Sequence, residues 1–369
     1  MKKLFLQVTS DKRQVTNFVF CLLLSTFCLL PGALFAQKQQ KIDVQSKVFT
    51  KNFTVNSKDI LEINTHYTKV TFQEWDRNEI DFTTTVTLSR ATEKEMEQLL
   101  NAISITTTQS GKKTKYKLSF SGNNLKVNSY EIELLVKIPN DIFLDIKSSF
   151  GNVELENALH NFNAEIDFGN LTVKKLFGSE NTITVKQGKL KLRQADNLTL
   201  NIDFSKGELR DIGTLTLKSS FSTLTIDRAN RVELSSSQDR ITIVSHIDHI
   251  EGKMDFGTLK INSLMSSCVF KQFSFSKITI DEVLRSFTHI TIISSQSTIV
   301  LNVPQDQSFA FDYSGSFTKF KDQNIKLNDA TFKAESNSVQ MSGIYGKNPD
   351  SGKKIKIEAS FGSVSLFEK

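Results

Sequence analysis

Hydrophobic and polar residues alternate along this chain in short runs, and one arrangement of runs recurs between about residues 143 and 301. In each copy a Ser or Asp, a Phe and a Gly or Ser separate two alternating runs. Alternation with a period of two predicts strands that bury one face. The clearest copies lie at residues 144–156, 164–174, 200–210, 215–227 and 253–262.

The turns between paired runs recur at a nearly constant interval. Successive turns are 18, 19, 17, 17, 17, 18, 19 and 20 residues apart if they lie at Phe150, Phe168, Gln187, Phe204, Phe221, Gln238, Phe256, Phe275 and Ser295. A fixed period near 18 is typical of stacked arrays, and two strands of about five residues plus two turns fill it. No helix fits between copies. We therefore predict an all-β, single-domain parallel β-helix, or β-solenoid, with coils about 4.8 Å apart.

The Phe of each turn has two interpretations. Stacked in successive coils, Phe150, Phe168, Phe204, Phe221, Phe256 and Phe275 would form either an exposed aromatic rail for sugar stacking or a buried ladder that fills the corner of the coil. We expect the buried ladder, because each Phe lies beside a small Gly or Ser that suits a tight, packed bend.

The residue before each Phe is an Asp or a Ser. Asp167, Asp203 and Asp255 alternate with Ser149, Ser220 and Ser274. A row of aspartates would suit calcium, but the glycine-rich nonapeptides of calcium-binding β-rolls are absent. We expect these residues to cap the turns.

Residues 1–36 predict a secretory signal peptide. Lys2 and Lys3 begin a basic segment, residues 18–30 are apolar and uncharged, and Ala36 offers a small-residue cleavage site. The apolar run is shorter than the roughly 20 residues of a spanning helix, so we expect no transmembrane segment after cleavage. A retained N-terminal anchor is the alternative. Cys21 and Cys28 lie in this segment without a lipoprotein cleavage pattern.

Residues 37–141 are expected to form an N-terminal β segment, as first coils or as an antiparallel cap, with one helical insertion. Strands are predicted at residues 48–55, 59–64, 69–75, 79–88, 116–120 and 130–138. A helix is predicted near residues 92–103, because Thr92 and Glu95 have capping-box spacing and Met96 and Leu99 begin an apolar stripe. Residues 142–369 are expected to hold the solenoid repeats and C-terminal coils. The segment from residue 299 onward should close the far end of the rod, and the regular last copy, at 354–368, should tie the terminus into the sheet.

Charge and cysteine content narrow the classes of protein. Without residues 1–36, 42 basic and 39 acidic residues leave a net charge of about +3, too weak and dispersed for nucleic-acid binding. Cys268 is then the only cysteine, so no intramolecular disulfide can form. Cys268 lies in an alternating run and is expected to be a small buried residue.

Few residues suggest chemistry. His246 and His249 are spaced as H-x-x-H, but they follow a strand, where residues three apart do not share a face. Trp75 and Asp76 are either a surface binding pair or, as we expect, a packed ring and a turn cap. His66, His160 and His289 are isolated, and no nucleophile elbow, P-loop or dinucleotide fingerprint occurs. We assign no catalytic residue, cofactor or metal site.

Two segments resemble a known family. KVTFQEWDRNEIDFT at residues 69–83 and LVKIPNDIFLDIKSSFGNVELE at 135–156 are similar to the hallmarks of the bacterial putative-adhesin domain family. The resemblance covers most of residues 48–369. It implies an exported β-solenoid, frequent in Gram-negative bacteria, and it carries over no catalytic residue. The chain departs from the usual glycine-rich turn, since many copies have Phe-Gly or Phe-Ser.

Three functions remain open. The first is an exported, non-enzymatic adhesin-like solenoid that binds a protein or a glycan at the cell envelope, in the periplasm, on the outer surface or after secretion. The second is a periplasmic structural or envelope-sensing scaffold, which a large exposed apolar patch would favour. The third is a carbohydrate-active β-helix, which short loops argue against and a charged cluster on one face would revive.

Overall fold

The computed structural model describes residues 44–89, 91–121, 129–323, 325–348 and 351–369, which belong to one compact unit spanning Asp43–Lys369. The predicted signal peptide, with Cys21 and Cys28, lies outside these residues. The N-terminal elements are β1 (Val44–Thr54), β2 (Ile60–His66), β3 (Lys69–Trp75), β4 (Glu79–Ser89), α1 (Glu93–Ala102), β5 (Ile103–Ser110), β6 (Lys113–Phe120) and β7 (Tyr130–Pro139).

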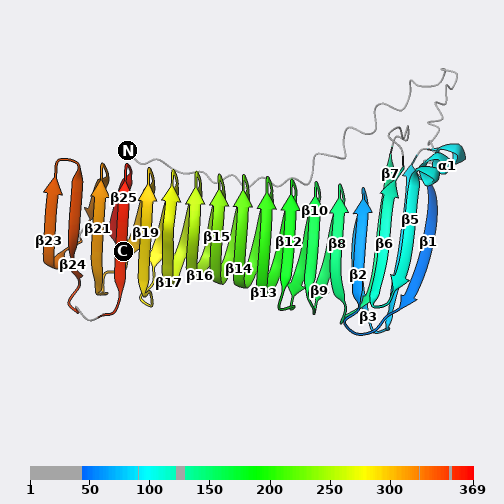
Figure 1. Cartoon of the computed structure of the whole chain (residues 1–369), viewed down its shortest axis with the longest axis horizontal. Coiled ribbons are helices and arrows are strands. Elements are labelled where there is room, and N and C mark those ends of the chain that lie inside the picture. The colour runs from blue at the N-terminus through cyan, green and yellow to red at the C-terminus, as the bar shows by residue number, and fades with distance from the viewer. Residues whose placement is uncertain (1–43, 90, 122–128, 324, 349–350) are drawn as a thin grey trace, which may run out of the picture. The chain divides into compact units, whose positions relative to one another are not determined.

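The remaining elements are all strands (Figure 1). The central ones are β8 (Phe143–Ser149), β9 (Asn152–Ala158), β10 (Phe162–Asp167), β11 (Asn170–Leu176), β12 (Asn181–Lys186), β13 (Lys189–Asp203), β14 (Lys206–Ser220), β15 (Thr223–Ser237), β16 (Arg240–Asp255), β17 (Thr258–Ser274), β18 (Lys277–Val283), β19 (His289–Ser295) and β20 (Thr298–Val303). The C-terminal ones are β21 (Phe309–Ser316), β22 (Lys319–Gln323), β23 (Leu327–Glu335), β24 (Ser338–Tyr345), β25 (Lys354–Ser360) and β26 (Ser363–Glu368).

The strands form the predicted β-solenoid. Each coil has a strand in one layer, a tight turn and a strand in a second layer, and equivalent strands of neighbouring coils pair in parallel, as β10 does with β8 and β12. Strands β13 to β17 run on through the second bend, so each covers the second strand of one coil and the first strand of the next. The predicted turn positions hold except the last, which is Gln296 rather than Ser295, because Ser295 still pairs within β19.

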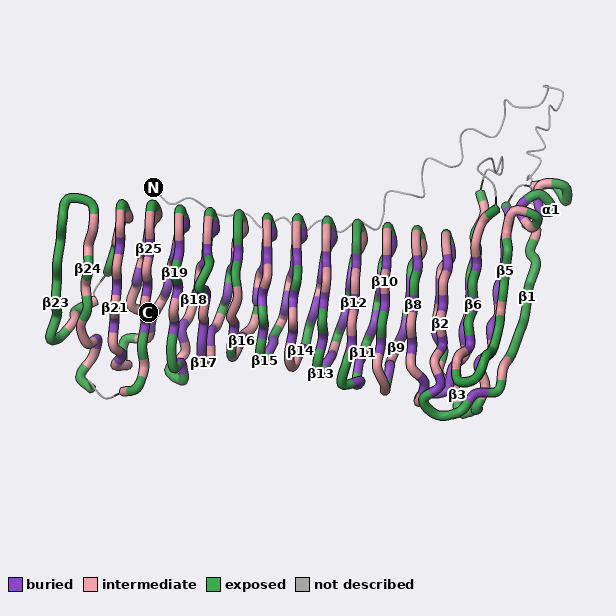
Figure 2. Tube along the Cα trace, viewed as in Figure 1, coloured by how far each residue is buried: buried purple, intermediate pink, exposed green. Residues whose placement is uncertain are grey.

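The core lies between the two layers. Inward-facing residues alternate with outward ones along every coil, which gives the banded pattern in Figure 2. Ile166, Val185 and Ile202 occupy one column and are fully buried. Because the side-chain period is two, a slip of one residue would turn a whole strand's apolar set outward, so burial fixes the register of each coil. Cys268 is buried in this core as predicted, and burial raises the pKa of its thiol.

Both the coil and the cap expected near the N-terminus are present. Strands β2 and β3 form a coil that pairs with β8 and, at Val70 and Thr71, with β9. Antiparallel pairings then extend the layers, with β5 on β6 and with β4 between β1 and β7. The sequence prediction missed β5. Strands β2 and β8 lie on opposite sides of the predicted domain boundary at residue 141 and pair directly. The boundary itself stays a prediction.

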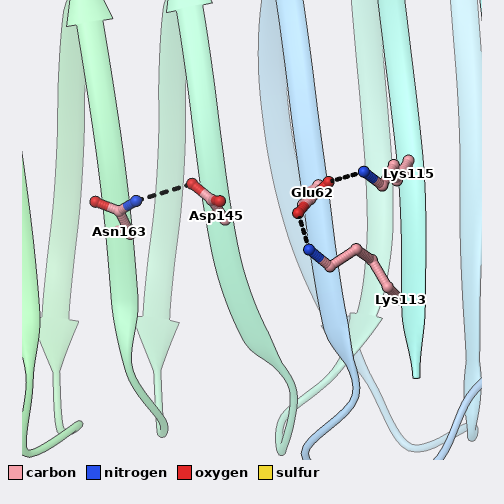
Figure 3. Close-up of polar contacts among 5 residues, drawn as sticks. All are labelled: Glu62, Lys113, Lys115, Asp145 and Asn163. Carbon is pink, nitrogen blue, oxygen red and sulfur yellow. Dashed lines mark hydrogen bonds and ion pairs between the residues drawn. The ribbon is translucent and has the colours of Figure 1, made fainter. Parts of the chain in front are cut away.

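Side chains reinforce this end. The predicted capping box is observed, with Thr92 and Glu95 bonded reciprocally at the start of α1. On the outer face of β2, Glu62 accepts hydrogen bonds from Lys113 and Lys115 of β6 (Figure 3). These bonds hold the pKa of Glu62 below its ordinary value.

The coils are not stacked in chain order at the C-terminal end. The final coil, β25 and β26, lies between the coil of β19 and β20 and the coil of β21 and β22 (Figure 1). The terminus is tied into the sheet as predicted, and its coil lies inside the stack rather than at the far end. That end is formed by β21, β24 and β23, which pair antiparallel. Both partners of β25 are parallel strands, so its coil has no free edge.

Candidate functional site: a groove beside the turn column

Twelve turn residues, one from each coil, line up along one edge of the solenoid, and we call them the turn column. Every member has a left-handed backbone, with φ between 47° and 59°. Each backbone N–H donates to a carbonyl of the next coil at 2.7–3.1 Å, so the order in space is fixed. That order is Tyr67, Phe150, Phe168, Gln187, Phe204, Phe221, Gln238, Phe256, Phe275, Gln296, Phe361 and Phe317.

The aromatic members of the turn column are exposed, which corrects the prediction of a buried ladder. They remain 47–61% exposed, whereas interior rings such as Phe270 and Phe309 are fully buried. The reason is the direction of the turn. The left-handed residue carries its side chain away from the space between the layers, and the corner is filled by the small residue that follows.

The rings of adjacent coils stack on one another. The spacing of coils, about 4.8 Å, is close to the separation that offset-stacked rings prefer. Five contacts have centroid distances of 4.6–5.0 Å and interplanar angles of 2–14°: Tyr67–Phe150, Phe150–Phe168, Phe204–Phe221, Phe256–Phe275 and Phe317–Phe361. Among the described residues no ring contact crosses a glutamine of the column. One face of each ring next to a glutamine therefore meets no other ring of the described residues.

A row of small residues forms the floor beside the column. A Cβ on Gly169 would lie 1.9 Å from the carbonyl oxygen of Gly151, and one on Gly188 would lie 2.0 Å from that of Gly169. Where serine takes the place of glycine, its hydroxyl joins neighbouring coils. Ser205 Oγ accepts from the N–H of Gly188 at 2.9 Å, and Ser222 Oγ accepts from that of Ser205 at 3.1 Å.

The turn-capping hydroxyls therefore follow the Phe rather than precede it. The side chains of Ser205 and Ser222 also donate to the carbonyls of Asp203 and Ser220, at 2.6 and 2.8 Å. The preceding Asp or Ser, which the sequence analysis expected to cap the turn, contributes mainly its backbone carbonyl. Its own side chain lies on the other side of the turn column, where Asp203 accepts a hydrogen bond from Ser220.

The far wall of the groove is polar and partly cationic. It consists of the residues two positions after each member of the turn column. Six of the twelve are basic and none is acidic: Lys69, Asn152, Asn170, Lys189, Lys206, Thr223, Arg240, Thr258, Lys277, Thr298, Ser363 and Lys319. In the described part of the chain Lys189, Arg240, Lys277 and Lys319 form no ion pair, whereas Lys206 lies 3.3 Å from Glu208.

The groove contains two hollows, one of them around Gln187. A cavity of about 710 Å³ extends there from Phe150 to Lys206 and includes the floor at Gly151, Gly169 and Gly188. A second cavity of about 710 Å³ continues from Phe221 to Thr298, with the buried carboxylate of Asp239 in its floor. Both volumes lie in the range typical of ligand sites, about 300–1,000 Å³.

The other candidates from the sequence lie away from this groove. His249 Nδ1 lies 2.9 Å from Ser267 Oγ on the outer surface of β16 and β17, and His246 lies one bend away. Within the described ranges no group of three or more His, Cys, Asp or Glu side chains could hold a metal ion.

Trp75 packs beside a turn, as expected. Its Nε1–H donates to the carbonyl of Glu79 at 2.8 Å, and Arg77 and Lys137 lie over its ring at 5.1 and 5.5 Å. Asp76 makes no side-chain hydrogen bond to any described residue, so the predicted cap by Asp76 is absent.

A family of known proteins matches part of the chain. Residues 58–226 match the model of a family described as Toastrack DUF4097. This segment is similar to the Toastrack DUF4097 family. The resemblance seen in the sequence is thereby confirmed for this segment, which runs from the first coil into β15. No curated protein matches the chain.

Several solved structures are similar to the chain at low identity. A putative adhesin from Parabacteroides merdae is 14% identical, with 87% of this chain and 96% of that chain covered and a TM-score of 0.39. A putative adhesin from Bacteroides fragilis is 9% identical, with 88% and 97% covered and a TM-score of 0.27. A putative cell adhesion protein from Clostridium sporogenes is 12% identical, with 88% and 100% covered and a TM-score of 0.20.

None of the helices in the described ranges is both long and apolar enough to cross a membrane.

Proposed function

We propose that this protein is an exported, non-enzymatic, adhesin-like β-solenoid that binds a protein or a glycan along the groove beside its turn column. One observation carries the proposal: nine aromatic side chains are held half exposed, in a row, on residues with a left-handed backbone. With about 200 Å² per aromatic side chain, their exposed fractions amount to roughly 900 Å² along one edge. Monomeric proteins typically expose apolar patches of about 300–600 Å². The row as a whole exceeds this range, although three glutamines divide it into smaller groups of rings.

Folding energetics alone give little reason for this row. A left-handed backbone costs a residue with a Cβ roughly 1–2 kcal/mol, which glycine would avoid. Each stacked ring contact returns about 0.5–1.5 kcal/mol beyond the area it buries. The cost of the left-handed backbone and the gain from ring stacking nearly cancel, and about half of each ring still faces water. The aromatic residues are therefore better explained by what they contact outside the chain.

The test removes rings without changing the turn. Asparagine tolerates the left-handed conformation, so Phe204→Asn with Phe221→Asn should keep the fold and delete one stacked pair. Phe332→Asn is the matched control, because Phe332 is a 64% exposed ring on β23, outside the turn column. The three proteins are compared on an array of glycans and immobilised envelope proteins from the native host. Binding that falls at least tenfold in the double variant alone supports the proposal, and binding that all three share overturns it.

The exposed apolar edge also favours a second candidate, a periplasmic structural or envelope-sensing scaffold that docks another protein. Location separates the two. Protease treatment of intact host cells digests a surface adhesin, whereas a periplasmic scaffold is protected until the outer membrane is opened. Binding by the groove is common to both candidates, so the array and the protease test answer different questions.

A further inference from the structure

The glutamines of the turn column make a different surface from the rings. Gln187, Gln238 and Gln296 occur at every third coil, are exposed, and form no side-chain hydrogen bond within the described part of the chain. The rings on either side of each are two coils apart, about 9.5 Å. Part of this distance is taken up by the thickness of the two aromatic rings. The remaining gap is wide enough for one further ring when the glutamine side chain turns aside. Each glutamine thus marks a slot with two aromatic faces and one free amide.

The slot at Gln187 differs from the other two in its charges. It lies between Phe168 and Phe204, its floor is Gly188, and its far wall carries the cations of Lys189 and Lys206. No carboxylate lines this cavity. At Gln238 the floor residue is Asp239, which offsets the charge of Arg240, and at Gln296 the wall residue is the uncharged Thr298. The Gln187 slot therefore combines aromatic faces with the cation of Lys189, which forms no ion pair among the described residues, and with Lys206, which is paired with Glu208 outside the cavity.

Amide groups continue along the same wall. Asn170 donates to Asn152 Oδ1 from its backbone N–H at 3.2 Å and from its side chain at 2.8 Å. The side-chain oxygen of Asn170 and the side-chain N–H groups of Asn152 make no hydrogen bond among the described residues, and both residues line the cavity. Such amides pair with hydroxyl groups, which give and accept hydrogen bonds. The wall thus offers hydroxyl partners on two coils beside the cations.

We propose that the groove centred on Gln187 binds an acidic polysaccharide, and this inference rests on the proposed binding function. A sugar ring of a uronic acid polymer has an apolar C–H face for Phe168 or Phe204. It also has hydroxyls for the amides and a carboxylate for Lys189. The polymer runs parallel to the column, because the groove continues over Asn170 and Asn152 in one direction and over Lys206 in the other. Poly-L-glutamate lacks the first of these contacts, single-stranded DNA lacks the carboxylate, and a neutral glycan lacks the last.

Calorimetric titration of the purified protein tests the ligand class. The probes are an oligogalacturonate of about ten residues, a neutral linear glucan of equal length, poly-L-glutamate and single-stranded DNA. We expect the oligogalacturonate to bind at least tenfold more tightly than each of the others. Equal binding of poly-L-glutamate or DNA would reduce the site to non-specific charge and overturn the inference. So would equal binding of the neutral glucan.

Three variants locate the site. Gln187→Phe fills the slot with a ring but leaves every cation in place, and it should abolish oligogalacturonate binding. Gln296→Phe adds the same ring at an equivalent turn whose own wall residue is the uncharged Thr298, with Lys277 only on the adjacent coil, and it should bind as the unmodified protein does. Lys189→Glu should weaken binding at least tenfold. If Gln187→Phe binds oligogalacturonate as tightly as the unmodified protein, the slot at Gln187 is not the binding site, whatever the other variants show.

The two proposals fail separately. If the array finds a ligand that depends on Phe204 and Phe221 but oligogalacturonate does not bind, the acidic-polysaccharide inference is wrong and the binding function stands. If no ligand depends on the aromatic rings and oligogalacturonate also fails, both are wrong.

Discussion

Replacing a glutamine of the turn column with phenylalanine should stabilise the protein. Gln238 has a φ of 59°, so its backbone strain is present before the substitution and no new strain is added. A phenylalanine there would stack on Phe221 and on Phe256, which today meet no ring across the gap. Two stacked contacts at about 0.5–1.5 kcal/mol each predict that Gln238→Phe raises the free energy of unfolding by about 1–3 kcal/mol.

Urea unfolding measures this gain, and Gln238→Leu is the control for apolarity without stacking. With an unfolding entropy of about 2.1 cal/mol/K per residue, a compact unit of this size should show a Tm increase of roughly 1–4 °C. The leucine variant should change the stability much less, because it adds apolar surface but no ring pair. A Gln238→Phe protein no more stable than the leucine variant would refute the in-register column on which the site argument rests.

Three further predictions test other parts of the fold. Phe150→Ala should cost about 0.5–1.5 kcal/mol more than Phe221→Ala in urea unfolding, because Phe150 stacks on two rings and Phe221 on one. Gly169→Ala should destabilise by about 2–3 kcal/mol, since its Cβ meets a backbone oxygen, whereas Gly207→Ala, facing only side chains at 3.3 Å or more, should change less. The lowered pKa of Glu62 means that its stabilising effect is present above its ordinary value of 4.5 and is lost as pH falls through the folded value. The stability difference between the unmodified protein and Glu62→Gln should therefore shrink in acid, and a difference that grows there would contradict the assignment.

The sequence predicted the solenoid because each coil repeats the same local signals. Alternation, period and turn residues recur at every copy, so errors at one position are corrected by the others. The single displaced turn, Ser295 in place of Gln296, occurred where the preceding coil is lengthened to 21 residues between Phe275 and Gln296. The repeat period can therefore be determined from the sequence even when the position of one turn is misplaced by one residue.

The repeat pattern could not show whether the Phe residues of the turns face the core or the solvent. Alternation assigns a residue to a face only while the backbone stays extended, and a left-handed residue breaks the rule. Phe is a poor match for that conformation, so the usual glycine or asparagine signal of a left-handed turn was missing. The signal that was present is the regular Phe followed by Gly or Ser, since a glycine that touches the backbone of the preceding coil leaves no room for a ring in the corner.

The order of coils at the C-terminal end was also beyond sequence reasoning. The copy at residues 354–368 looks like its neighbours, and every coil offers the same backbone edges above and below. Its local pattern does not indicate whether this coil stacks between β19 and β21 or at the end of the solenoid. The choice depends on the antiparallel hairpin of β23 and β24, whose strand β24 pairs on the free side of β21 and leaves the other side open to β25.

The glutamines have a second physical consequence, which can be separated from binding. A column of twelve stacked rings would expose a continuous, flat apolar edge with the strand spacing that favours association between chains. The glutamines divide it into groups of two or three rings, about 200–300 Å² each by the same area estimate. Replacing Gln187, Gln238 and Gln296 together with Phe should therefore give a more stable but self-associating protein, measured by light scattering against concentration. If this triple variant stays monomeric, the glutamines are not needed for solubility, and the binding slots become the better explanation for their spacing. If it associates while Gln187→Phe alone stays monomeric and loses oligogalacturonate, the same residues serve both purposes.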